Sequence, residues 1–276
     1  MKLVRTMRSC RNFFAIAFLA TLAPSIALAQ YDATTIFDPD EDIYSRSLTL
    51  ELQNPTSDQA IRIDGQLDEE AWSELPRYTG FNQIMPKKGE DASEKTEVQF
   101  FIRDGYVYAA YRAYETDPSQ MSAPLIRRDE NRVASDWVWL FIDSNMDGLT
   151  AFAFGVNPRG VLRDIKYFED TEEDNLWDAV WEGAAEINDE GWTAEFKIPL
   201  SQLRYDADLE NHTWGINFFR EFGRFRELSS WDPVSPDLDA FTSQSAILQN
   251  IGPLPKTQTL EVLPYVSQEL YRAPND

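Results

Sequence analysis

A polar turn between two apolar runs carries the oxygen donors of a cation site. Asp143, Asn145 and Asp147 alternate along this turn, and Gly148 follows them. Oxygen ligands at the first, third and fifth positions, with glycine at the sixth, are typical of the first half of a calcium loop. The twelfth position, which should be glutamate, is Phe154, so the turn is not an EF-hand. Two hypotheses stay open: a structural calcium site, and a plain hairpin turn that uses Asp-Gly.

A second candidate site is the charged stretch Arg127-Arg128-Asp129, the most basic patch of an acidic chain. Guanidinium and carboxylate groups form hydrogen bonds with sugar hydroxyls, and arginine also binds the carboxylate of a uronic acid. The stretch lies in a long connection, residues 115–135, and long loops on a β scaffold are usual places for a site. The alternative is a solvated loop whose charges pair with the abundant carboxylates.

Trp231 is the third candidate, in the irregular segment 221–240 and directly before Asp232-Pro233. The proline fixes the local backbone and removes a hydrogen-bond donor. A ring held by a loop on a scaffold is placed for contact with a ligand. The alternative is that the ring folds back and caps an open end of the core.

The sequence gives little support for catalysis. His212 is the single histidine and stands alone before a predicted strand, and the only cysteine, Cys10, lies in the N-terminal segment. There is no GxSxG, HExxH or phosphate-loop motif. Carboxylates are numerous, but none form a pair that spacing singles out for glycoside hydrolysis. Glu195 alternates within a predicted strand, which would place it toward solvent or a concave face.

The elements that must hold these residues are strands. The stretch 136–164 contains three apolar runs joined by short polar turns, which is typical of an antiparallel meander. Its first run alternates between two apolar faces, with Trp137, Trp139 and Phe141 on one and Val138, Leu140 and Ile142 on the other. Both faces being apolar predicts strands that are covered on both sides.

Other segments agree with this reading. Asp104-Gly105 predicts a hairpin turn between strands at 97–103 and 106–114. Asp68 can cap a short helical turn that directs Trp72 into the core. The sequence therefore predicts an all-β fold, an antiparallel β-sandwich with short helical turns, over residues 48–256.

The first 29 residues have the organisation of a secretory signal peptide. Four basic residues precede an apolar run from Phe13 to Leu22, and Ala27-Leu28-Ala29 is a typical cleavage site. Residues 30–47 form an acidic segment that predicts a flexible leader. We therefore expect an exported protein that acts in the periplasm, at the outer membrane or outside the cell.

The charge of the chain excludes some partners. The 276 residues carry 47 acidic and 25 basic side chains, a net charge of −22. Removal of the signal peptide deletes four basic residues and no acidic ones, which gives 21 basic residues and a net charge of −26. Such a surface repels nucleic acid and anionic membranes, and it suits neutral ligands or divalent cations.

A spaced set of segments resembles the family 9 carbohydrate-binding modules. The segments are IDGQLDEEAW, EVQFFIRDGYVYAAYRAYETDP, RRDENRVASDWVWLFID, FGVNPRG and GWTAEFKIPLSQL, and together they cover roughly residues 60–252. These modules are β-sandwiches found beside xylanases and related glycosidases. Within that superfamily the chain is most similar to bacterial proteins in which the module precedes an outer-membrane β-barrel. The tail, residues 257–276, resembles the start of such a barrel.

The resemblance implies a sugar site in which two tryptophan rings clamp the ligand. Trp231 matches one ring, but the segment 131–135, where the other is expected, has no tryptophan. Trp177 or Trp181 would have to replace it from a neighbouring loop. The resemblance also favours calcium, because members of the family hold structural calcium.

Three functions follow from these observations. The first is a non-catalytic module that binds a glycan or polysaccharide and serves carbohydrate catabolism. The second is a structural or interaction domain of an outer-membrane barrel protein, without a sugar ligand. The third, which the residues support least, is a glycosidase.

Overall fold

The computed structural model describes residues 43–45, 48–130 and 132–256. The predicted signal peptide and the tail at 257–276 lie outside the described residues. Of the predicted leader, only the 3₁₀ turn Ile43–Ser45 is described. No helix in the described part of the chain is both long and apolar enough to cross a membrane.

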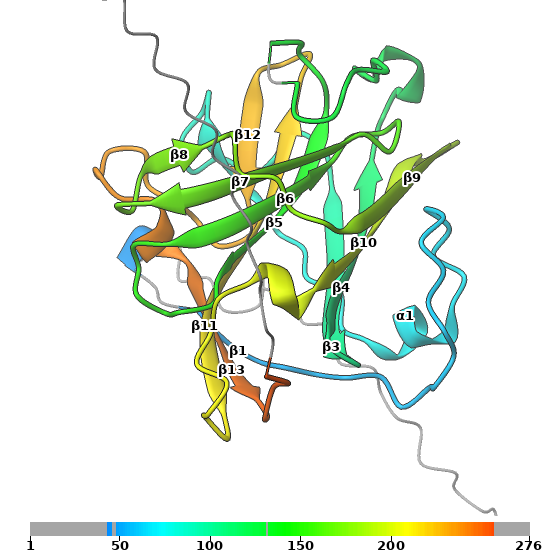
Figure 1. The fold of residues 1–276 in the computed structure, drawn as a ribbon. Coiled ribbons are helices and arrows are strands. Elements are labelled where there is room, and N and C mark those ends of the chain that lie inside the picture. Colours follow the sequence, from blue (N-terminus) through cyan, green and yellow to red (C-terminus); the bar gives the residue numbers. More distant parts are fainter. Residues whose placement is uncertain (1–42, 46–47, 131, 257–276) are drawn as a thin grey trace, which may run out of the picture.

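Two β-sheets pack face to face (Figure 1). The larger sheet has the strand order β1-β13-β11-β5-β6-β7-β8, with β12 paired to β11 and β2 paired to β12. Its strands are β1 (Thr49–Glu51), β2 (Asn82–Met85), β5 (Trp137–Asp143), β6 (Ala151–Val156), β7 (Leu162–Phe168), β8 (Glu172–Asp174), β11 (His212–Phe222), β12 (Glu227–Ser230) and β13 (Ala246–Ile251). Only β1 and β13 pair in parallel.

The smaller sheet has the order β3-β4-β10-β9 and is antiparallel throughout. Its strands are β3 (Thr96–Arg103), β4 (Tyr106–Tyr114), β9 (Glu182–Asn188) and β10 (Gly191–Pro199). The short helix α1 (Glu70–Glu74) covers its outer face, and 3₁₀ turns lie at Pro118–Gln120, Leu200–Gln202 and Thr242–Gln244. The predicted all-β sandwich and the Asp104-Gly105 hairpin are confirmed.

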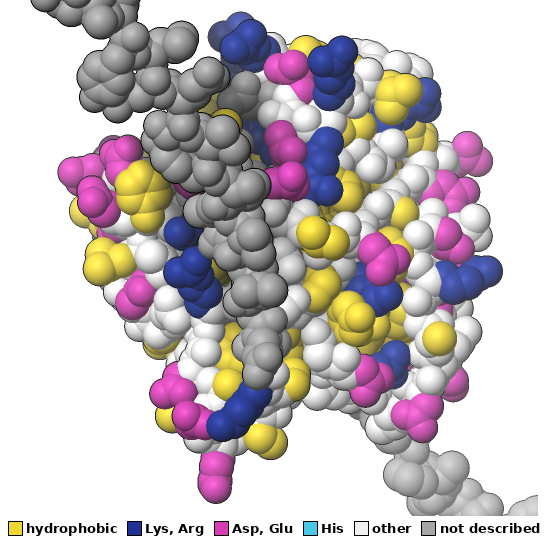
Figure 2. All heavy atoms as spheres, viewed as in Figure 1, with side chains coloured by type: hydrophobic (Ala, Val, Ile, Leu, Met, Phe, Trp, Pro, Cys, Tyr) yellow, Lys and Arg dark blue, Asp and Glu magenta, His cyan; other side chains and the backbone are white. Residues whose placement is uncertain are grey.

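The alternation of β5 works as the sequence predicts. Val138, Leu140 and Ile142 point into the main core between the sheets. Trp137, Trp139 and Phe141 point to the outer face of the larger sheet, where they join a second apolar cluster. Every residue of β5 is buried, so the outer face of this sheet is covered as well. Charged side chains of both signs are scattered over the surface shown in Figure 2.

A buried carboxylate fastens the segment before α1 to the smaller sheet. Glu195 on β10 is fully buried, and its two oxygens accept from Asp64 N (3.0 Å), Gly65 N (2.9 Å) and Trp72 Nε1 (3.2 Å). Gly65 has a φ of +88°, and a Cβ there would lie 2.6 Å from the carbonyl carbon of Ala185. Only glycine fits that turn without strain. The expectation that Glu195 faces solvent or a concave face is wrong, because this segment lies over it.

A buried arginine joins the two sheets at one end. Arg220 on β11 is 2% exposed. Its guanidinium donates to Thr96 Oγ1 (3.2 Å) on β3, to Tyr114 O (3.0 Å) on β4 and to Glu115 Oε1 (2.7 Å). The larger sheet is therefore tied to the smaller one through a single side chain.

The Glu195 carboxyl makes stability depend on pH. Burial, against the hydrogen bonds that favour the charge, raises its pKa from 4.5 to about 7. A raised pKa means that the folded state binds the proton more tightly than the unfolded state. This contribution is therefore complete below about pH 4.5 and is lost as the pH rises through about 7.

We predict that wild-type protein loses about 1–3 kcal/mol more of its unfolding free energy than Glu195→Gln does between about pH 5 and pH 8. Urea unfolding of both proteins at the two pH values measures this difference. A parallel pH dependence in the two proteins would contradict it.

Candidate ligand-binding groove

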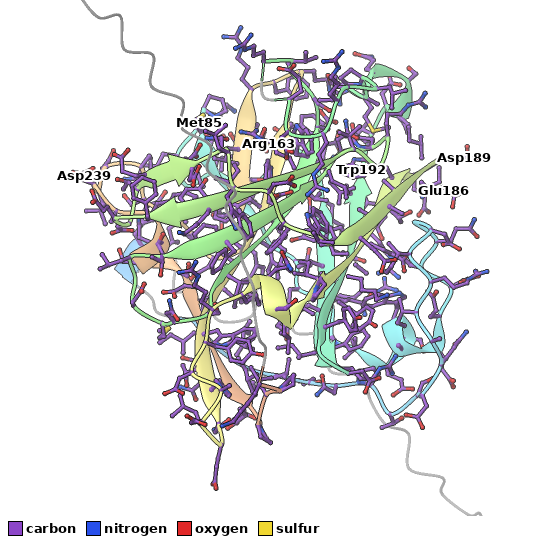
Figure 3. The ribbon with its side chains drawn as sticks, in the orientation of Figure 1. Met85, Arg163, Glu186, Asp189, Trp192 and Asp239 are labelled. Carbon is purple, nitrogen blue, oxygen red and sulfur yellow. The ribbon has the colours of Figure 1, made fainter. Side chains whose placement is uncertain are left out.

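Two adjoining cavities open on the outer face of the larger sheet. We call the first, of about 400 Å³, the aromatic cavity, and the second, of about 430 Å³, the arginine cavity. Both are lined by Met85, Arg163, Glu221 and Leu228, so they are parts of one groove, called here the outer groove. Figure 3 shows Met85 at the upper left, Arg163 at the upper centre and Glu186, on β9, at the right edge of the molecule.

The floor of the aromatic cavity is a set of packed rings from three strands and a loop. Phe141 contacts Tyr167 with ring centroids 5.2 Å apart and Phe241 at 5.4 Å. Phe241 stacks on Tyr167 at 5.3 Å and on Phe219 at 5.4 Å. Trp139 completes the lining. Because each ring is held by its neighbours, the floor is formed before any ligand arrives.

Polar groups stand above this floor. The Arg163 guanidinium lies 5.3 Å from the centre of the Trp139 ring, and its Nη2 donates to Asn175 Oδ1 at 2.9 Å. The Tyr167 hydroxyl donates to Glu173 Oε1 at 2.8 Å. The cavity therefore offers a guanidinium, a carboxylate and a phenol beside aromatic rings.

Glu221 lies at the junction of the two cavities. Burial raises its pKa, while the Arg163 charge and the Trp139 N–H lower it. Trp139 Nε1 is buried without an acceptor in full hydrogen-bonding geometry, although it lies close enough to Glu221 to favour the charged carboxylate. A buried donor and a half-buried acceptor at the same point in a groove can both bind a hydroxyl.

Gly155 on β6 makes room for Trp139. It pairs with Trp139 across the β5–β6 ladder. A Cβ at Gly155 would lie 2.6 Å from the indole ring, closer than carbon atoms can pack. The missing side chain lets the indole lie across β6 and form one side of the cavity.

The structure corrects the prediction for Trp231. Its side chain is 3% exposed and belongs to the main core. The ring meets Tyr78 edge-on at 5.4 Å and Phe218 at 5.7 Å. The ring has no free face for a sugar, and the alternative account, a residue that packs on the core, holds.

Trp177 and Trp181 also pack inward, away from the outer groove. Trp177 contacts Phe152 at 5.0 Å, and Trp181 stacks on Phe196 at 5.6 Å. Both rings lie against the main core between the sheets. Neither replaces a missing clamp residue in the groove.

Arg128 and Asp129 are brought together with Trp181 around the buried Asp164. One Asp164 oxygen accepts from Arg128 Nη2 (2.5 Å) and Trp181 Nε1 (3.2 Å), and the other from Ala179 N (2.6 Å). Arg128 also pairs with Asp129 (3.4 Å) and Asp178 (3.2 Å). Arg128 therefore anchors a loop and is not free for a ligand.

Asp129, Asp164 and Asp178 have oxygens within 4.8 Å of one another, a spacing that could hold a metal ion. The Arg128 guanidinium already pairs with all three carboxylates. Arg127 is exposed nearby and does not line the outer groove.

The turn with Asp143, Asn145 and Asp147 is held by its own backbone. Asp143 is buried and accepts from Asn145 N (3.1 Å) and Gly148 N (2.8 Å). Asp147 accepts from Leu149 N (2.8 Å) and Thr150 N (2.7 Å). A carboxylate oxygen that accepts one backbone N–H keeps a further lone pair, so these hydrogen bonds leave acceptor capacity for a cation. Calcium at the turn stays a prediction.

The residues of the outer groove were missed as site residues, although part of the signal was present. The alternation of β5 places Trp139 and Phe141 on one face. They were not predicted as site residues, because the sequence predicts that this face is covered by other elements. Arg163 and Glu173 lie on the neighbouring strands β7 and β8, but Glu221 joins them only through the pairing of β11 with β5, β5 with β6 and β6 with β7, which no local pattern indicates.

No protein-family model matches this sequence, and no curated protein matches it. Solved structures do share its fold. A candidate carbohydrate-binding protein from Bacteroides uniformis superposes with a TM-score of 0.59 at 12% identity, over 74% of this chain and 99% of that one. A family 9 carbohydrate-binding module from Caldicellulosiruptor kristjanssonii, in complex with cellotriose, gives 0.52 at 13% identity over 79% of this chain and 100% of that one. The same organism's module in complex with glucose gives 0.51 at 13% over 78% and 100%. The likeness confirms a β-sandwich of the family 9 type.

We predict that Gly155→Ala displaces the Trp139 ring and costs about 1–3 kcal/mol of unfolding free energy, as for other overpacked sites. Near-ultraviolet circular dichroism should change as well. Gly252→Ala is the matched control, since a Cβ there meets nothing within 4 Å, and it should stay within about 0.5 kcal/mol. Equal stabilities of the two variants would show that the indole does not depend on Gly155.

We predict that Trp231→Ala costs about 3–5 kcal/mol of unfolding free energy, because it leaves a cavity in the core. Leu238→Ala, on the same connection but 57% exposed, should cost no more than about 0.5 kcal/mol. Denaturant melts of both variants measure the costs. A Trp231→Ala protein as stable as wild type would return the ring to the list of ligand residues.

Proposed function

We propose that this chain binds a glycan in the outer groove and does not turn it over. The observation that carries the proposal is the aromatic cavity, where packed rings lie beside Arg163, Glu173 and Glu221. The C–H face of a sugar ring packs on aromatic carbon, while charged groups bind its hydroxyls. The volume of about 400 Å³ lies within the range of small-molecule sites.

The fold supports this proposal. The structural neighbours include a candidate carbohydrate-binding protein and modules in complex with cellotriose and with glucose. Among the described residues that line the groove there is neither a histidine nor a cysteine. Of the carboxylates there, Glu173 accepts a hydrogen bond from Tyr167, and the nearby charge of Arg163 favours the ionised form of Glu221. Binding, and not hydrolysis, is what these contacts favour.

The cellular setting forms part of the proposal. Export rests on the sequence of residues 1–29, and attachment to an outer-membrane barrel rests on residues 257–276. Both segments lie outside the described residues. A glycan-binding domain in the cell envelope would serve carbohydrate uptake and breakdown by delivering a polysaccharide to the partner proteins of the domain.

The test is a glycan array probed with the full chain, followed by calorimetry with the strongest oligosaccharide. We predict that Arg163→Ala weakens this binding by about tenfold or more, the effect of losing a hydrogen bond from a charged group. Arg62→Ala is the control, because Arg62 is exposed and lies on the segment that covers the smaller sheet. It should bind like wild type.

Two results would contradict the proposal. One is silence across neutral and acidic glycans, soluble and insoluble. The other is a bound glycan whose affinity Arg163→Ala leaves unchanged while the melting temperature shows a folded protein. Release of reducing sugar that disappears on Glu221→Gln would instead favour a glycosidase.

A further inference from the structure

The arginine cavity contains two arginines that form no ion pair with the described residues. Arg132 and Arg226 both line it, and both are exposed. Within the described part of the chain, neither guanidinium forms an ion pair or a hydrogen bond. Basic side chains elsewhere are mostly paired with carboxylates, as in Arg62, Arg77, Lys87, Lys88, Lys95, Arg103, Lys197 and Lys256.

The carboxylates of the same cavity are engaged by other groups. Glu227 accepts from Ser93 N (3.0 Å) and Ser93 Oγ (2.5 Å), and is buried. Glu130 accepts from the backbone N–H of Arg132 at 3.0 Å. The charge of Arg163 favours the ionised form of Glu221. These carboxylates keep their charge, but within the described part of the chain none of them forms an ion pair with Arg132 or Arg226.

This arrangement is unusual for the molecule. The chain has a net charge of −22, so an anion is repelled by most of its surface. The two arginines come from the connection before β5 and from the β11–β12 hairpin, which meet at the upper end of the molecule in Figure 1. Figure 2 shows Lys and Arg side chains at that end, with Asp and Glu side chains among them. The feature of this cavity that an anion can use is the pair Arg132 and Arg226, which form no ion pair with the described residues.

We propose that the arginine cavity selects glycans that carry an anionic group, a carboxylate or a sulfate ester. The sugar ring lies in the aromatic cavity, and the anionic group lies beside it between Arg132 and Arg226. This inference rests on the proposed function, because it assumes that the outer groove holds the glycan. Arg163 and Glu221, which line both cavities, contact the part of the ligand that lies between them.

Arginine suits this task physically. Its planar guanidinium donates two parallel hydrogen bonds to a carboxylate, and it matches the oxygens of a sulfate in the same way. Two such groups around one anion also provide a charge attraction that neutral sugars lack. That attraction falls as salt rises, since the cavity is open to solvent and the Debye length shrinks from about 30 Å at 0.01 M to about 8 Å at 0.15 M.

The experiment uses the full chain and an array of matched oligosaccharides. Each backbone is present in a neutral form, a uronic acid form and a sulfate-ester form, and the best matched set is then measured by calorimetry. We expect at least one anionic form to bind about tenfold or more tightly than its neutral counterpart at low salt. The gap should narrow when salt is added.

Variants locate the effect. The double variant Arg132→Ala with Arg226→Ala should lose about tenfold in affinity for the anionic form and keep its affinity for the neutral form. Arg204→Ala is the matched control. Arg204 is also exposed and has no ion pair among the described residues, but it lies by Ser144, past the far end of β5. It should change neither affinity.

The outcomes separate the two proposals. A preference for the uronic acid or for the sulfate ester alone supports the inference and identifies the anion. Neutral forms that bind as tightly as both anionic forms overturn it and leave glycan binding intact. An anionic preference that survives in the double variant overturns the assignment to this cavity. Binding of no form overturns both proposals.

Discussion

The buried Arg220 fixes the register of β11, and with it which side chains of this strand face the core and which face the outer groove. The two Nη groups of its guanidinium donate to groups on the smaller sheet and to Glu115, so β11 cannot slide along its neighbours without leaving a buried charge unpaired. Such a charge costs several kcal/mol. Side chains alternate along a strand, and with Arg220 facing the core, Phe219 and Glu221 must face the outer groove. The contacts of Arg220 in the interior thereby determine that Phe219 and Glu221 line the outer groove.

Buried carboxylates hold the loops in place by accepting hydrogen bonds from them. Glu195 holds the segment before α1, and Asp164 holds the loop that carries Trp177 and Trp181. Asp136 accepts from Gly223 N at 2.7 Å next to the β11–β12 hairpin. A charged acceptor binds backbone N–H groups strongly in a protein interior. Many acidic residues of this sequence are therefore structural, and their number alone says little about a ligand.

The sequence was a good guide to the strands and a poor guide to the site, for one reason. Period-two alternation and Asp-Gly turns are local signals, and β3, β4 and β5 follow them closely. The direction of a loop side chain is decided by partners far along the chain. Arg128 turns toward Asp164, 36 residues away, and Trp231 is drawn into the core by Tyr78 and Phe218. No local pattern could indicate either contact.

The residues of the outer groove come from two kinds of element, strands for its floor and loops for its rim. Its aromatic floor comes mainly from β5, β7 and β11, where the hydrogen-bonded ladders allow little movement. Its unpaired arginines come from a connection and a hairpin tip, which can change in sequence at little cost to the core. An aromatic floor suits sugar rings in general, because it packs against the C–H face that many sugars share. Under the proposed function, the charged groups at the rim would select among sugars, and their number and sign can differ between proteins of one fold. At 12–13% identity the chain keeps the sandwich of its structural neighbours, because a core tolerates many substitutions when its pattern of buried side chains is kept.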